Sequence, residues 1–219
     1  MKKVILILAV LSFSLCGYAN DDNPYMEGQI VLSNGEVKTG LVKIPKAPSD
    51  REISFKIIQN GGRETIKVEE IKSITIHSKS GETFVLECLK LDLRPKIGKV
   101  KITKHAGILF LVSEGYAKLY VASNAYKVNE DGNIEVTHSF YQGTDLPTFN
   151  YYIKKEGEDV ATFFCYTVPS SPMIGLQKLL IRRCEIVLND DPALIRRIKN
   201  EEFNHMQIPE IIQAYNEGK

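Results

Sequence analysis

The stretch from Gly28 to Ile76 constrains the fold more than any other part of the chain. Apolar and polar residues alternate on both sides of Asn34-Gly35. Asn-Gly between two such runs predicts a β-hairpin, closed by a type I′ turn in which both residues adopt positive φ. Ile53, Phe55 and Ile57 then alternate with polar residues, as expected for a half-buried strand. We therefore expect a compact β-unit over residues 28–76.

The pattern of this unit resembles small SH3-like or Sm-like barrels. Two strands joined by Asn-Gly are followed by an alternating third strand and by the run from Glu69 to Ile74, and Gly40 lies in the second strand. In such barrels a glycine often lets the second strand bend sharply for closure. The resemblance implies a partly barrel-like unit, and it brings no RNA-binding role because we expect the chain to be exported.

Hairpin signals continue after the first unit. Asp131-Gly132 separates the β-patterned runs 125–128 and 134–140, and residues 156–158 separate 149–154 from 160–168. Residues 108–112 form the most apolar run after the N-terminal segment and predict a central strand buried on both faces. Hairpins in series predict an antiparallel meander rather than parallel crossovers. We expect one β-rich body over residues 28–168.

The chain then changes to helical patterns. Ser171 and Pro172 have the signature of an N-cap followed by the first helical residue, Asp191-Pro192 repeats it, and Pro209 opens a last short helix. Apolar residues recur at helical spacing at Leu176, Leu180, Cys184 and Val187. Helices this short are marginal alone, so they must dock on the sheet. The predicted fold class is α+β: an antiparallel, partly barrel-like β meander with a short helical cap over residues 172–216.

Residues 1–19 have the pattern of a signal peptide. Lys2 and Lys3 precede an apolar run over residues 4–15, which is shorter than the ~20 residues of a membrane-spanning helix. Small residues then predict cleavage between Ala19 and Asn20. Lipidation of Cys16 is the less favoured alternative, because Leu15 stands where lipoprotein signals have a small residue. We expect a soluble periplasmic or secreted protein with a flexible leader over residues 20–27 and no transmembrane segment after cleavage.

Short motifs in the second half resemble a set of uncharacterised exported proteins of Gram-negative bacteria. The motifs are Phe110-Leu111 before Gly115, Leu119-Tyr120, Tyr151-Tyr152, Asp191-Pro192-Ala193-Leu194, Ile211-Ile212 and Tyr215-Asn216. The resemblance covers most of the chain after residue 19. It implies a β-rich layout and export, and it implies no activity.

The residues that could carry chemistry are scattered. The four histidines are unclustered and no Cys-x-x-Cys occurs, so no metal or other cofactor is expected. Signal cleavage would leave Cys88, Cys165 and Cys184, an odd number of thiols that allows at most one disulfide. We expect three buried structural thiols, although the sequence leaves open any pairing or a triad assembled with a distant histidine. The patterns therefore favour a protein that is not an enzyme.

Binding is the function that the sequence favours. A formal net charge of +1 gives no field that would recruit nucleic acid. Tyrosine suits contact surfaces because its ring is apolar and its hydroxyl is polar, and Tyr116, Tyr120 and Tyr151 are the candidate binding residues. We expect a non-catalytic exported protein that binds an envelope or secreted protein or a glycan. The alternative is a hydrolase acting on cell-envelope material.

Overall fold

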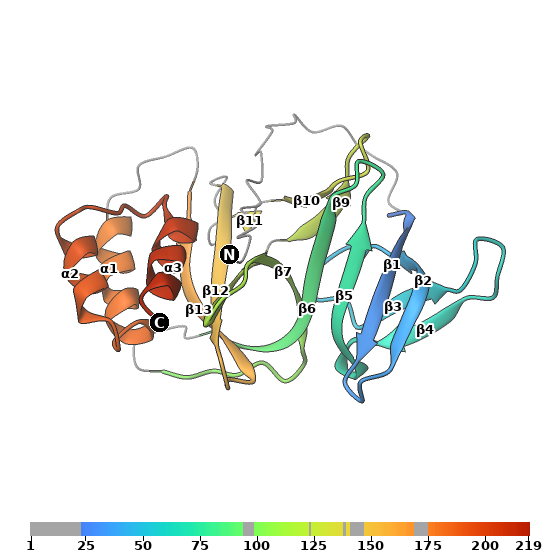
Figure 1. Ribbon diagram of the computed structural model, residues 1–219, viewed down its shortest axis with the longest axis horizontal. Helices are drawn as coiled ribbons and strands as arrows, with labels where there is room; N and C mark the ends of the chain where they lie inside the picture. Colours follow the sequence, from blue (N-terminus) through green and yellow to red (C-terminus); the bar gives the residue numbers. More distant parts are fainter. Residues whose placement is uncertain (1–22, 94–98, 123, 138, 141–146, 169–174) are drawn as a thin grey trace.

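The computed structural model describes residues 23–93, 99–122, 124–137, 139–140, 147–168 and 175–219 (Figure 1). The described chain is β-rich and ends in three short helices, so the predicted α+β class is confirmed. Ala19 and Asn20, at the predicted cleavage site, lie outside the described residues. In Figure 1 the helices lie at one end of the long axis and the first β-unit lies at the other.

Five strands and a one-turn 3-10 helix form the first β-unit. They are β1 (Tyr25–Leu32), β2 (Val37–Lys43), β3 (Glu52–Lys56), β4 (Glu64–Lys67), the 3-10 helix Val68–Glu70, and β5 (Ile71–His77). Their order in the sheet is β5-β1-β2-β3-β4, so the last strand returns to pair with the first. Strand β1 begins inside the segment predicted to be a flexible leader, because Met26 is buried in the core of this unit.

Two local predictions in this unit are wrong. Ile57 does not continue the buried alternation of Ile53 and Phe55, because β3 ends at Lys56 and the side chain of Ile57 is exposed. The turn between β1 and β2 is also not type I′, because Gly35 has a φ of 90° whereas Asn34 does not have positive φ.

A three-residue loop joins β1 to β2 instead of the expected two-residue turn. The amide of Gly35 donates to the carbonyl of Leu32 (3.0 Å), and the amide of Leu32 donates to the carbonyl of Glu36 (2.8 Å). These bonds describe a type I turn followed by a glycine in the left-handed region. The side chain of Asn34 favours this turn by accepting a hydrogen bond from the amide of Glu36 (2.9 Å).

A ring of five strands forms the second β-unit. Its members are β6 (Thr83–Asp92), β7 (Gly107–Ser113), β8 (Ala117–Ala122), β12 (Pro147–Lys155) and β13 (Val160–Thr167). Neighbours pair in this order, and β13 pairs with β6 to close the ring. The ring confirms the partly barrel-like β body, and its closing pair, β13 with β6, is parallel, an exception to the predicted antiparallel pairing.

Strand β7 lies between two hydrophobic cores. Ile108 packs into the core of the first β-unit, whereas the next residue, Leu109, packs inside the ring, and both are fully buried. The predicted central strand buried on both faces is therefore confirmed. The predicted hairpin at Asp131-Gly132 is also present, formed by β9 (Ala125–Val128) and β10 (Ile134–Thr137), while β11 (Ser139–Phe140) pairs with β12.

Three helices cover the outer face of the ring: α1 (Leu176–Val187), α2 (Pro192–Lys199) and α3 (Ile208–Glu217). Their apolar sides form a third core with Leu119 of β8, Ile153 of β12 and Phe164 of β13. The helical cap is therefore docked on the β body, and Figure 1 shows it beside β12 and β13.

The observed first residues of α1 and α2 can be compared with the capping signals in the sequence. Asp191 caps α2 as predicted, since its side chain accepts a hydrogen bond from the amide of Leu194 (2.9 Å). Helix α1 begins at Leu176, with Gly175 in a left-handed conformation as its N-cap. Ser171 and Pro172 themselves lie outside the described residues.

Candidate functional site

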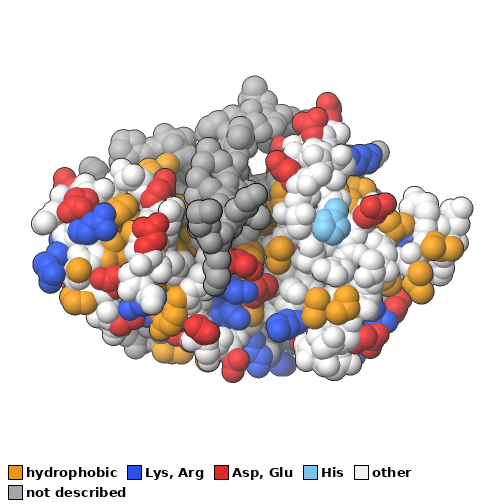
Figure 2. Space-filling view, in the orientation of Figure 1, with side chains coloured by type: hydrophobic (Ala, Val, Ile, Leu, Met, Phe, Trp, Pro, Cys, Tyr) orange, Lys and Arg blue, Asp and Glu red, His pale blue; other side chains and the backbone are white. Residues whose placement is uncertain are grey.

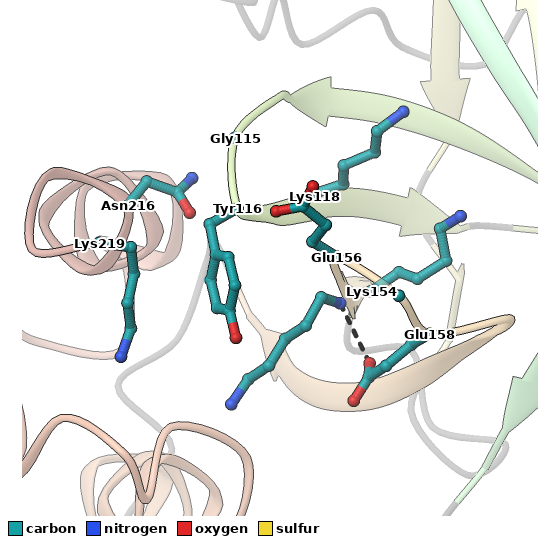
Figure 3. A pocket seen from close by; sticks show the side chains of 10 residues that line it. Gly115, Tyr116, Lys118, Lys154, Glu156, Glu158, Asn216 and Lys219 are labelled. Atoms are coloured by element: carbon teal, nitrogen blue, oxygen red, sulfur yellow. Dashed lines mark hydrogen bonds between the residues drawn. The ribbon is translucent and has the colours of Figure 1, made fainter.

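A pocket of about 510 Å³ lies where the ring of strands meets the helical cap (Figure 3). We call it the seam pocket. It is formed by the approach to β8, the end of β12, the β12–β13 turn and the C-terminal end of α3. Its lining residues are Gly115, Tyr116, Lys118, Lys154, Lys155, Glu156, Gly157, Glu158, Asn216 and Lys219.

Asn216 holds the helical wall of the seam pocket against the ring. Its side-chain oxygen accepts a hydrogen bond from the amide of Ala117 (2.8 Å), and its side-chain nitrogen donates to the carbonyl of Ala117 (3.0 Å). The neighbouring position needs to be small, because a Cβ atom on Gly115 would overlap the amide group of Asn216. The position of α3 relative to β8 therefore depends on the Asn216 side chain, which makes the two hydrogen bonds to Ala117 that the backbone of a neighbouring strand would make.

Asp190 gathers three groups at one side of the pocket. Its carboxylate accepts hydrogen bonds from Lys219 (2.6 Å), Lys155 (2.9 Å) and the hydroxyl of Tyr215 (2.8 Å). Burial by itself would raise the pKa of Asp190, but these donors outweigh it and hold the pKa well below its usual range. The same contact raises the pKa of Lys219, which therefore stays protonated at neutral pH.

Glu87, on β6 of the ring, is likewise contacted by two lysines and a tyrosine hydroxyl. Its carboxylate accepts hydrogen bonds from Lys118 (2.6 Å) and from the hydroxyl of Tyr120 (2.7 Å), and the ammonium of Lys154 lies 3.8 Å away. Only 11% of the Glu87 side chain is exposed, and burial alone would raise its pKa. The donors outweigh burial and lower the pKa, so Glu87 is charged at neutral pH.

Each of these carboxylates therefore lies between two lysines of the pocket wall. Glu156 and Glu158 also line the pocket, and Figure 3 shows both of them beside the lysines. The wall thus presents ammonium donors and carboxylate acceptors close together. Its four lysines outnumber its two glutamates, and Glu87 and Asp190, which do not line the pocket, balance the remaining positive charge. The ring of Tyr116, which is 37% exposed, adds an apolar surface next to them.

The structure places the three predicted tyrosines in different environments. Tyr116 lines the seam pocket. Tyr120 is fully buried inside the ring, where its hydroxyl orients Glu87 beneath the pocket. Tyr151 is half-buried on the outer face of β12 and packs under the helices, away from the pocket lining.

Sequence reasoning did not select the charged residues of this site. Glu87, Asp190, Lys154 and Lys219 come from four different elements or their ends, so no local motif joins them. One signal was available at Glu87, because a carboxylate inside the apolar run 84–89 of β6 needs a partner when it is buried.

The thiols lie away from the seam pocket. Cys165 and Cys184 are buried in the core between the ring and the helical cap, Cys88 on β6 is partly buried against the core of the first unit, and all three are free thiols. Burial raises the pKa of Cys88 and of Cys165 to about 12. Among the described residues, no group of three or more histidine, cysteine or carboxylate side chains is placed to hold a metal ion.

No family model, curated protein or solved structure matches this chain. The resemblance to exported proteins of Gram-negative bacteria accordingly stays a prediction from short motifs. Within the part of the chain that the structure describes, every helix is too short or too polar to cross a bilayer.

Proposed function

We propose that the chain is an exported, non-catalytic binding protein of the cell envelope or the extracellular space, and that it binds a glycan in the seam pocket. The observation that carries this proposal is a pocket wall with four lysines, held by Glu87 and Asp190, and two glutamates, Glu156 and Glu158, beside the ring of Tyr116. Sugar hydroxyls both donate and accept hydrogen bonds, so a wall offering both kinds of group suits them. The apolar face of a sugar ring can also pack on an exposed tyrosine ring.

The protonation states support binding rather than catalysis. A general acid at neutral pH needs a raised carboxyl pKa, whereas the pKa values of Glu87 and Asp190 are lowered. A nucleophilic lysine needs a lowered pKa, whereas that of Lys219 is raised. These groups are therefore suited to act as fixed charged donors and acceptors.

Soluble peptidoglycan fragments and envelope-derived oligosaccharides can test this proposal by calorimetric titration. We expect binding to the wild-type chain and a loss of about tenfold in affinity for Tyr116→Ala, which removes the apolar surface. Tyr25→Ala is a matched control, because Tyr25 lies on β1 in the other β-unit. Equal affinities of the two variants would place the ligand elsewhere.

A photoreactive phenylalanine derivative at position 116 tests the same site without a chosen ligand. Crosslinking in the native envelope should yield an adduct whose added mass contains saccharide, and the same group at Met206, exposed in the helical cap region, should not. A polypeptide adduct specific to position 116 would show that the partner is a protein and would overturn the glycan assignment.

A hydrolase acting on envelope material is the second candidate. The observation in its favour is that two carboxylates, Glu156 and Glu158, line one pocket, as the acid and base of glycosidases do. Incubation with peptidoglycan separates the two functions. Release of new reducing ends that is lost in Glu156→Gln or Glu158→Gln would establish hydrolysis, whereas unchanged substrate with measurable binding supports the binding protein.

A further inference from the structure

The turn between β3 and β4 carries the two most exposed large apolar side chains of the described residues. Ile57 is 75% exposed and Ile58 is 64% exposed. They follow each other directly after β3 ends at Lys56. Both side chains therefore expose apolar surface to water. A contact that buries this surface would be favourable.

The fold presents these side chains at an extremity. In Figure 1 the β3–β4 hairpin projects at the end of the long axis opposite the helices, and Figure 2 shows apolar side chains on the surface at that end. The amide of Gly61 donates to the carbonyl of Ile58 (2.9 Å), which closes the turn. The side chain of Ile58 lies over Gly61, since a Cβ there would be 2.9 Å from Cγ1 of the isoleucine.

A cationic residue stands on each side of this apolar tip in the sequence. Lys56, whose ammonium lies 4.5 Å from the centre of the Tyr25 ring, precedes the isoleucines, and the exposed Arg63 follows the turn. The nearest carboxylate in the sequence, that of Glu64, lies 3.1 Å from the ammonium of Lys38, which also lies 3.4 Å from Glu36. The hairpin tip therefore has two exposed apolar side chains with a positively charged residue before them and another after them in the sequence.

We propose that the tip of the β3–β4 hairpin, Ile57 and Ile58, inserts into the interface of a membrane that contains anionic lipids. Apolar side chains enter the boundary between headgroups and acyl chains, while Lys56 and Arg63 lie at the level of the negatively charged headgroups. The positive charge of Lys56 and Arg63 complements the negative surface of such a membrane. Membrane contact at this end leaves the seam pocket and the helical cap away from the bilayer.

Vesicle co-sedimentation tests the proposal with the full chain as recovered from cells. Wild type and variants are compared in the same background, so any contribution from residues before 23 is common to all. We expect binding to phosphatidylcholine vesicles that contain phosphatidylglycerol, and a loss of about tenfold or more in the partition coefficient for Ile57→Ser with Ile58→Ser. Ile102→Ser is the matched control, because Ile102 is 52% exposed outside this hairpin.

A second vesicle-binding experiment tests the contribution of the positive charge on Arg63. Arg63→Gln should weaken binding to the anionic vesicles by several-fold and leave binding to pure phosphatidylcholine unchanged. The proposal is overturned if the double serine variant binds as wild type does, or if wild type binds neither kind of vesicle. It is also overturned if wild type forms dimers in solution that the double variant abolishes, because the tip would then be a contact between copies of the chain.

Discussion

The side-chain amide of Asn216 pairs with the backbone of Ala117 through two hydrogen bonds, of 2.8 Å and 3.0 Å. A residue near the end of the last helix thereby completes the hydrogen bonding of a strand in the middle of the chain. Because Gly115 makes room for this amide, the pairing joins the helical cap to the ring and forms one wall of the seam pocket.

Asn216→Ala should lower the free energy of unfolding by about 2 kcal/mol, since it removes two hydrogen bonds and leaves partly buried backbone groups of Ala117 without this partner. Chemical denaturation measures the change. Gln213→Ala is the control on the same helix, because its side chain is exposed and bonded only locally to Glu217. A change for Asn216→Ala as small as that for Gln213→Ala would contradict the anchoring role.

Glu87→Gln should lower the free energy of unfolding by about 2 kcal/mol near neutral pH, because two lysines lose their shared partner in a largely buried place. The folded pKa of Glu87 lies below its unfolded value, so its contribution is present above about pH 4 and is lost as the pH falls through the folded pKa. Denaturation of both proteins at about pH 7 and about pH 3 should therefore show a smaller difference in acid. The exposed pair partner Glu64 offers the control Glu64→Gln, with an expected change of less than about 1 kcal/mol.

The helical cap should be required for the β body to stay folded. Leu180 is fully buried between α1 and the ring, so Leu180→Asp should destabilise the chain by about 4 kcal/mol or more, and a chain ending at residue 170 should aggregate or unfold. Circular dichroism melting and size-exclusion chromatography report the outcome. A truncated body that stays monomeric and melts at the wild-type temperature would show that the cap contributes nothing to stability.

The thiols should react as buried structural groups. Iodoacetamide should modify Cys165 and Cys184 on the order of a hundredfold more slowly in the native protein than in the unfolded chain, because burial raises their pKa values. Cys88→Ala should cost about 1 kcal/mol through lost packing. Because the unfolded thiols ionise first, stability should fall as the pH rises from about 9 toward 12. Equal alkylation rates in the two states would argue for an accessible, reactive cysteine.

Export should remove the first nineteen residues. The basic start, the short apolar run and the small residues before Asn20 predict cleavage after Ala19. Intact-mass measurement of protein recovered from the periplasm or the medium checks the N-terminus. A species that retains Met1, or that carries lipid on Cys16, would contradict cleavage at this position.

Local patterns determined the elements of this protein and the faces that they bury. The hairpin around Asp131-Gly132 and the cap at Asp191 are where their residues predict, because turn and cap preferences depend on only a few neighbours. Ile108 and Leu109 face two cores, as an uninterrupted apolar run indicates. The same logic mispredicted Ile57, because alternation shows which side a residue takes within a strand and does not show where the strand ends.

Tertiary structure alone decided how the elements combine. The parallel pairing of β13 with β6 joins segments distant in the sequence, and the seam pocket depends on contacts such as Asn216 with Ala117 and Lys155 with Asp190. Such partners are selected by the shape and burial of the whole fold, which no short pattern contains. Charged side chains on separate strands and helices therefore become one site only after the helices dock and the strands close their ring.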